Sequence, residues 1–91
     1  MTAEALSKVI VKGMEEKKAS DILIMDLRKI KNSVADFFVI CSGTSDTQLE
    51  AISESIEEEV HKVQKTPSRR LEGKANGEWV LIDYFDVVVH I

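Results

Sequence analysis

The stretch DFFVICSGTSD, residues 36–46, decides the fold class. Its apolar run, residues 37–41, is closed by small polar residues at 42–45, and a short run bounded in this way is typical of a buried strand. A helix start follows at once, because Ser45 and Gln48 have the spacing of a capping box, with Thr44 and Asp46 as competing caps. We therefore predict a strand that leads directly into a helix.

This helix carries one apolar stripe, whose members recur three or four residues apart. They are Leu49, Ile52, Ile56, Val60 and Val63. Glu50, Glu54, Glu57, Glu58 and Glu59 fall on or beside the opposite, solvent-facing side. Pro67 excludes a longer helix, and the residue before it, Thr66, is biased toward extended geometry. The stripe predicts packing against a sheet.

The remaining elements follow from the same signals. A helix is predicted over residues 2–18 with Thr2 as its N-cap, and residues 21–27 read, like residues 37–41, as a strand buried on both faces. Residues 28–33 form a connection, 69–72 a short edge strand and 74–77 a turn containing Asn-Gly. Residues 78–83 and 87–91 are expected to be antiparallel neighbours around 84–86. This order predicts an α/β fold of the α+β kind, a mixed β-sheet flanked by helices in a single domain, 1–91.

Composition supports a small folded protein. The chain has 91 residues, of which 44% are hydrophobic and 31% charged, and this length suits one modest core. No apolar run approaches the ~20 residues of a membrane span, and the N-terminus lacks the apolar segment of a signal peptide. Cys41 is the only cysteine, which fits a reducing compartment. We expect a cytoplasmic protein without direct membrane contact.

Charge divides the chain into two halves. Residues 1–45 hold seven basic and six acidic residues, whereas residues 46–91 hold five basic and ten acidic ones. An acidic half argues against broad phosphate-backbone binding, which needs a basic stripe, so no sequence-specific nucleic acid is expected. It favours a basic protein partner, because complementary charge speeds encounter.

Signals for catalysis are weak. Cys41 lies before a helix N-terminus, where a thiol can become nucleophilic, but only His61 and His90 are available as bases and neither is near it in sequence. The favoured interpretation is a small buried residue. The loop at 43–45 could hold a phosphate but lacks the lysine and spacing of a P-loop. We expect no catalytic residue.

Metal and cofactor signals are equally weak. Only carboxylates are left as candidate ligands, and Asp83 and Asp86 flank a turn, where shaping the connection at 84–85 is the simpler role. We expect neither a metal nor a cofactor.

The single tryptophan is the most suggestive aromatic residue. Alternation places Trp79 on the same strand face as Leu81 and Asp83, and an aromatic beside a charge is typical of a half-exposed face. Trp and Tyr are favoured interface anchors. A core role for Trp79 is equally compatible with this pattern.

Two stretches resemble a known family. Residues 35–45, with Gln48, Ala51 and Ile52, are similar to one signature of the ribosomal silencing factor (RsfS, or Iojap-like) family. Gly73 followed by residues 77–91 resembles its second signature, and Asp21-Ile22 also fits. Family members usually continue into a segment rich in Phe, Arg, Tyr, Leu and Trp, and we expect this C-terminal tail to be absent.

The resemblance implies a nucleotidyltransferase-like fold and a specific function. The family binds ribosomal large-subunit protein L-fourteen and sterically blocks joining of the small and large subunits, which represses translation under nutrient limitation. An active nucleotidyltransferase would need paired acids on a strand about ten residues after the loop, and here that distance falls within the Glu-rich helix, so we expect no enzyme.

We expect the partner-binding residues to be Trp79, Asp83, Tyr84 and Asp86, with Glu78 at the rim. Two alternatives stay open. One is a residual nucleotide-binding or nucleotidyltransferase-like protein that uses Gly43, Ser45 and Asp46, and the other is a homodimeric structural module. A homodimer is also possible for a silencing factor.

Overall fold

In the computed structural model, residues 2–33, 35–64, 70–73 and 79–91 are described. The elements along the chain are α1 (Ala3–Glu16), β1 (Ser20–Asp26), β2 (Phe37–Ser42), α2 (Asp46–Gln64), β3 (Arg70–Glu72), β4 (Leu81–Asp83) and β5 (Val87–His90). This order confirms the predicted fold class, helices on a mixed sheet.

The strands form one five-stranded sheet in the order β1-β2-β5-β4-β3. β2 and β5 are parallel, whereas the other neighbours are antiparallel. The predicted antiparallel pairing of the last two strands is confirmed, with Leu81 opposite His90 and Ile82 opposite Val89. Backbone hydrogen bonds between Val80 and Ile91 extend this pair beyond the strand ends.

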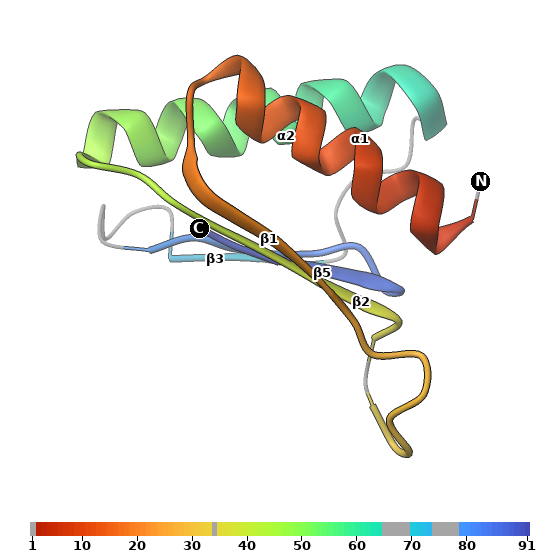
Figure 1. The fold of residues 1–91 in the computed structure, drawn as a ribbon. Coiled ribbons are helices and arrows are strands. Elements are labelled where there is room, and N and C mark those ends of the chain that lie inside the picture. Colours follow the sequence, from red (N-terminus) through yellow and green to blue (C-terminus); the bar gives the residue numbers. More distant parts are fainter. Residues whose placement is uncertain (1, 34, 65–69, 74–78) are drawn as a thin grey trace.

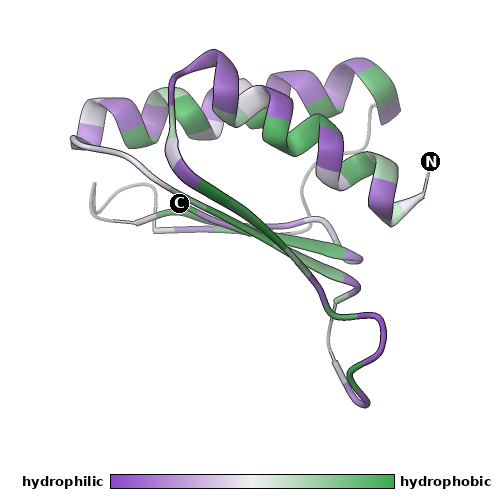
Figure 2. Ribbon diagram, viewed as in Figure 1, coloured by the Kyte–Doolittle hydropathy of each residue, from purple (hydrophilic) through white to green (hydrophobic). Residues whose placement is uncertain are grey.

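Both helices lie on one face of the sheet (Figure 1). The core fills the space between them and the strands, and Figure 2 shows apolar colour on the sheet strands and alternating with polar colour along both helices. From the sheet, Val39, Ile82, Val87 and Val89 are fully buried, and Ile10, Met14, Ile52 and Ile56 meet them from the helices. No helix among the described residues covers the other face of the sheet (Figure 1).

Helix α1 is capped as predicted and approaches α2 closely. Thr2 accepts a hydrogen bond from the Ala5 amide on its Oγ1 at 3.1 Å. At the crossing, Ser55 Oγ donates to the Gly13 carbonyl at 2.9 Å. A Cβ added to Gly13 would stand 2.9 Å from the Ile56 Cα, so the backbones are in contact.

The prediction that residues 21–27 and 37–41 are strands buried on both faces is wrong. β1 is an edge strand with Leu23, Ile24 and Met25 all exposed, and β2 alternates between buried and half-buried positions. The physical reason is that α1 and α2 cover only one face of the sheet, and that β1 lies at the edge, where Ile24 stays partly exposed even on the side of the helices.

The α2 stripe is confirmed at Leu49, Ile52, Ile56 and Val60, but Val63 is 47% exposed, so burial ends one turn earlier. Glu59, predicted on or beside the solvent face, is buried. Its carboxylate lies 3.7 Å from Lys12 Nζ and 3.3 Å from Lys62 Nζ. Burial raises the pKa of Glu59, but the Lys62 hydrogen bond and the Lys12 charge outweigh it and leave the pKa lowered.

Some predictions fall on residues outside the described part of the chain. These are Thr66, Pro67 and Arg69, the turn at 74–77, and Glu78. The edge strand predicted at 69–72 appears as β3. None of the described helices offers an apolar stretch of the length that crossing a bilayer requires.

Candidate functional site

The sheet face turned away from the helices carries a continuous set of partly exposed apolar side chains. Strand register brings them together, because Leu23 faces Ile40 and Met25 faces Phe38 across β1 and β2. Phe38 is likewise level with Val88, and Leu81 with His90. We call this surface the open face; its apolar members are Leu23, Met25, Phe38, Ile40, Trp79, Leu81 and Val88, and its polar members are Asp83 and His90.

Trp79 is 37% exposed and stacks on His90, with ring centroids 6.3 Å apart and an interplanar angle of 22°. His90 also meets the Phe38 ring at 6.5 Å, so three rings form a row across β2, β5 and the segment before β4. Because Leu81 is opposite His90, the predicted shared face of Trp79 and Leu81 is confirmed.

Gly73 holds Trp79 in this position. Its φ is +84°, a left-handed conformation that favours glycine. A Cβ added there would stand 2.6 Å from the Trp79 Cζ3 atom, well inside van der Waals contact. The indole therefore lies directly against the backbone of residue 73.

The turn between β4 and β5 is tight. Asp83 accepts a hydrogen bond from the Phe85 amide at 2.8 Å, and the Asp86 amide donates to the Tyr84 carbonyl at 3.0 Å. That second bond defines a γ-turn, and Phe85 has a φ of +77°, which is strained for a non-glycine residue. The Phe85 side chain is 64% exposed, so the turn presents an aromatic ring to solvent.

The structure separates the predicted partner-binding residues. Trp79 and Asp83 lie on the open face, and Asp86 is exposed in the turn beside them. Tyr84 is instead part of the core and only 7% exposed; burial, and then the charge of Glu57, raises the pKa of its hydroxyl. Glu78 lies outside the described residues.

Sequence reasoning missed most residues of the open face, and it also missed Phe85 in the turn. Phe38 and Val88 belong to the open face, and alternation within residues 37–41 and 87–91 was the available signal for their orientation. Phe85 had no such signal, because its exposure depends on the backbone conformation of the turn.

The polar groups of the loop that leads into α2 form hydrogen bonds with one another and with the first turn of the helix. The Thr44 amide donates to Gln48 Oε1 at 2.6 Å, and the Gln48 amide donates to Ser45 Oγ at 3.1 Å. The Thr47 amide donates to Asp46 Oδ1, so a carboxylate already occupies the helix N-terminus where a phosphate would bind. This arrangement disfavours the nucleotide-binding alternative.

Cys41 is buried at the end of β2, as the favoured interpretation predicts. Burial raises the pKa of its thiol to about 11, whereas a nucleophilic cysteine needs a lowered one. Among the described residues, no three His, Cys, Asp or Glu side chains come together as a metal ion would need.

An accessible apolar sheet face with stacked rings and nearby carboxylates is suited to holding a protein surface. In fold, the molecule is thus a small mixed-sheet domain with helices on one face of the sheet and an accessible apolar surface on the other.

Comparison with known proteins identifies the family. Residues 1–91 match the family model described as "Ribosomal silencing factor during starvation". The chain is 37% identical to ribosomal silencing factor RsfS of Halalkalibacterium halodurans, covering 100% of this chain and 76% of that protein. It is 36% identical to RsfS of Bacillus subtilis, with 100% and 75% covered. The chain therefore belongs to the ribosomal silencing factor family, whose name describes a regulatory role in translation.

The fold agrees with that assignment. A crystal structure of a Chromobacterium violaceum protein superposes with a TM-score of 0.91 at 31% identity, covering 99% of this chain and 73% of that one.

Proposed function

We propose that this protein binds the large ribosomal subunit through ribosomal protein L-fourteen and thereby blocks joining of the small subunit. The proposal includes repression of translation under nutrient limitation, a cytoplasmic location, and action by binding alone, without catalysis. Family membership supports a ribosomal role. The observation that carries the binding site is Trp79, a large aromatic side chain left 37% exposed on an apolar sheet face that no described helix covers.

Two physical arguments support the open face as the contact surface. Aromatic side chains dominate the binding energy of protein interfaces, and Trp79 and Phe85 are both accessible there or at its edge. Asp83 and Asp86 add negative charge next to these rings, which suits a basic partner. Because the Tyr84 ring is buried, we assign it to holding the turn that carries these carboxylates, not to direct contact.

Co-sedimentation with purified large subunits tests the proposal. Trp79→Ala removes the central anchor and should weaken binding well over tenfold, since an aromatic anchor commonly contributes ~2 kcal/mol or more and ~1.4 kcal/mol is one decade. Val63→Ala is the matched control, because it also truncates a partly exposed apolar side chain, but on α2.

Circular dichroism and a thermal melt show whether each variant is folded. A folded Trp79→Ala protein that binds at wild-type strength would remove Trp79 from the site. Adding small subunits to the saturated complex tests the second step, and joined ribosomes forming at the normal rate would refute the steric block.

A possible homodimer stays a prediction. Analytical ultracentrifugation of the free protein measures it separately from ribosome binding.

A further inference from the structure

A small apolar pocket opens at one end of the open face. It has a volume of about 130 Å³ and is lined by Leu27, Ala35, Phe38 and Val88. Phe38 and Val88 come from adjacent strands of the open face, whereas Leu27 and Ala35 come from the connection between β1 and β2. In Figure 1 this connection extends beyond the sheet on the side away from the helices.

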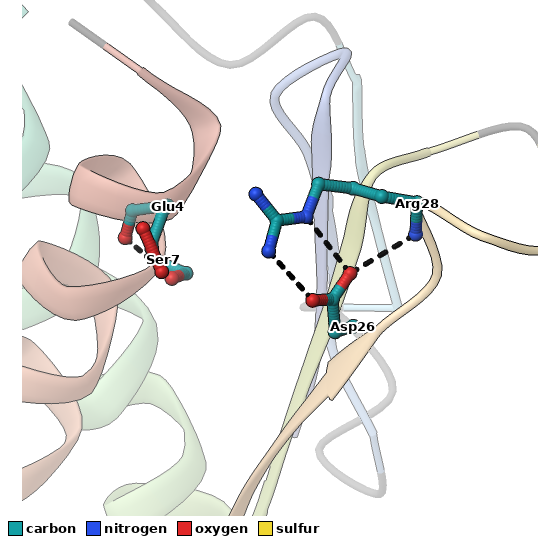
Figure 3. A network of polar contacts seen from close by, with 4 residues as sticks. All are labelled: Glu4, Ser7, Asp26 and Arg28. Carbon is teal, nitrogen blue, oxygen red and sulfur yellow. Dashed lines mark hydrogen bonds and ion pairs between the residues drawn. The ribbon is translucent and has the colours of Figure 1, made fainter.

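Backbone hydrogen bonds hold the connection that forms two walls of this pocket in place. The Leu27 amide donates to the Asp36 carbonyl, and the Asp36 amide donates to the Asp86 carbonyl, each at 2.8 Å. At the end of β1, Arg28 folds back on Asp26 with two side-chain hydrogen bonds, of 3.0 and 2.7 Å (Figure 3). The Arg28 guanidinium also lies 4.9 Å above the ring of Phe37, which is buried on the helix side of β2, so these contacts stabilise the end of β1 and do not line the pocket. The pocket is therefore formed before any partner arrives.

Carboxylates lie beside the pocket. Asp83 is directly opposite Val88 across β4 and β5, so its side chain neighbours the pocket wall on the same face. Asp36 and Asp86 are exposed and joined through their backbones. Asp26 is paired with Arg28 and contributes little net charge, and Lys29 and Lys31 lie further along the connection.

We infer that this pocket receives one aliphatic side chain of the ribosomal partner, and that Asp83 and Asp86 bind a lysine or arginine next to it. The inference rests on the proposed function and names a second anchor point for it, beside Trp79. The volume suits such a group, since an apolar cavity of about 150 Å³ holds a benzene molecule. The chemistry of the occupant follows from the lining and its surroundings, which are apolar walls with carboxylates beside them.

Filling the pocket tests the inference. Val88→Phe adds bulk to a half-buried side chain at the pocket wall, and should weaken co-sedimentation with large subunits at least tenfold while the melting temperature stays within a few degrees. Val63→Phe, the same substitution at a partly exposed position on α2, is the matched control and should bind like the wild type. If Val88→Phe fails to fold, Leu27→Ala, which removes another wall, is judged by the same criterion.

The outcomes separate this inference from the proposed function. Wild-type binding by folded Val88→Phe, with Trp79→Ala still defective, overturns the pocket and leaves the ribosomal site intact. If the wild-type protein does not sediment with large subunits, the proposed function itself fails. If Val88→Phe changes only self-association in the ultracentrifuge, the occupant is a second copy of this chain and the inference is overturned.

Discussion

At the scale of single residues, Gly73 and Trp79 are in direct contact at the open face. The tryptophan can lie this close to residue 73 because glycine has no Cβ, which would meet both the indole and the carbonyl oxygen of Trp79, and because glycine adopts the required positive φ. Gly73 is thus a positioning residue that acts through Trp79.

Gly73→Ala should displace the indole and weaken ribosome binding. The alanine costs ~1–2 kcal/mol in a left-handed conformation, and its Cβ collides with the ring. Trp79 is the only tryptophan, so its fluorescence emission reports the displacement directly. Gly43→Ala is the control, because the added Cβ meets the flexible side chain of Leu49 at 3.0 Å and Gln48 Oε1 at 3.5 Å, and no φ in the left-handed range has to be kept there. Native emission together with native binding in Gly73→Ala would show that the contact is dispensable.

The same scale shows what the sequence could predict about the site. Alternation places Trp79 outward, and continued past Asp83 it also places Tyr84 inward with Ile82. The burial of Tyr84 was missed because residues 84–86 were interpreted as a connection between the strands, to which the alternation was not applied. The exposure of Phe85 could not be predicted, because it depends on a strained φ, and no residue type in the turn indicates such a conformation.

At the scale of elements, the two helices are held together by a close backbone approach at Gly13. Most helix pairs are separated by side chains, but here the Ile56 backbone comes within van der Waals contact of the glycine, and Ser55 bonds its carbonyl. In the sequence, Gly13 and Met14 follow Leu6 and Ile10 at helical spacing, which indicates the apolar side of the helix but gives no sign of this contact.

Gly13→Ala should therefore destabilise the fold. Alanine gains ~1 kcal/mol of helix propensity over glycine, but overpacking against a backbone that cannot move aside costs ~1–3 kcal/mol. Urea unfolding measures the difference. Lys8→Ala, an exposed substitution on the same helix, should change stability by less than ~0.5 kcal/mol. A Gly13→Ala protein more stable than the wild type would show that the helices separate freely.

For strands β1 and β2, the sequence predicted the strands themselves but not how far they are buried. The runs at 21–27 and 37–41 correctly predicted strands, because apolar residues between polar ends determine local structure. Burial on both faces was wrong for each, because it depends on how many layers cover the sheet and on which strand is at the edge. A run such as Leu23-Ile24-Met25 could form a central strand covered on both faces or an edge strand covered on one, and its sequence does not distinguish the two.

At the scale of the whole molecule, the net charge is −4, and two groups of acidic residues can be compared because they lie in separate places. Several glutamates line the exposed side of α2, on the helical side of the molecule, whereas Asp83 and Asp86 lie at the open face and its turn. If ribosome binding depended only on net charge, an acidic residue of either group would contribute equally to affinity. If it depends on the open face, their contributions must differ.

Two charge reversals distinguish these cases. Asp86→Lys and Glu50→Lys each change the net charge from −4 to −2, since an acid is replaced by a base. Asp86→Lys should weaken co-sedimentation with large subunits less than Trp79→Ala does, because an exposed rim charge mainly slows association. Its defect should shrink as salt rises, since the Debye length falls from ~10 Å at 0.1 M to ~3 Å at 1 M, so that salt screens the attraction that the variant has lost.

Glu50→Lys is the control and should bind nearly like the wild type at every salt concentration, because its side chain is on α2. Equal defects in the two variants would mean that the ribosome senses overall charge, and the acidic residues at the open face would then have no local role.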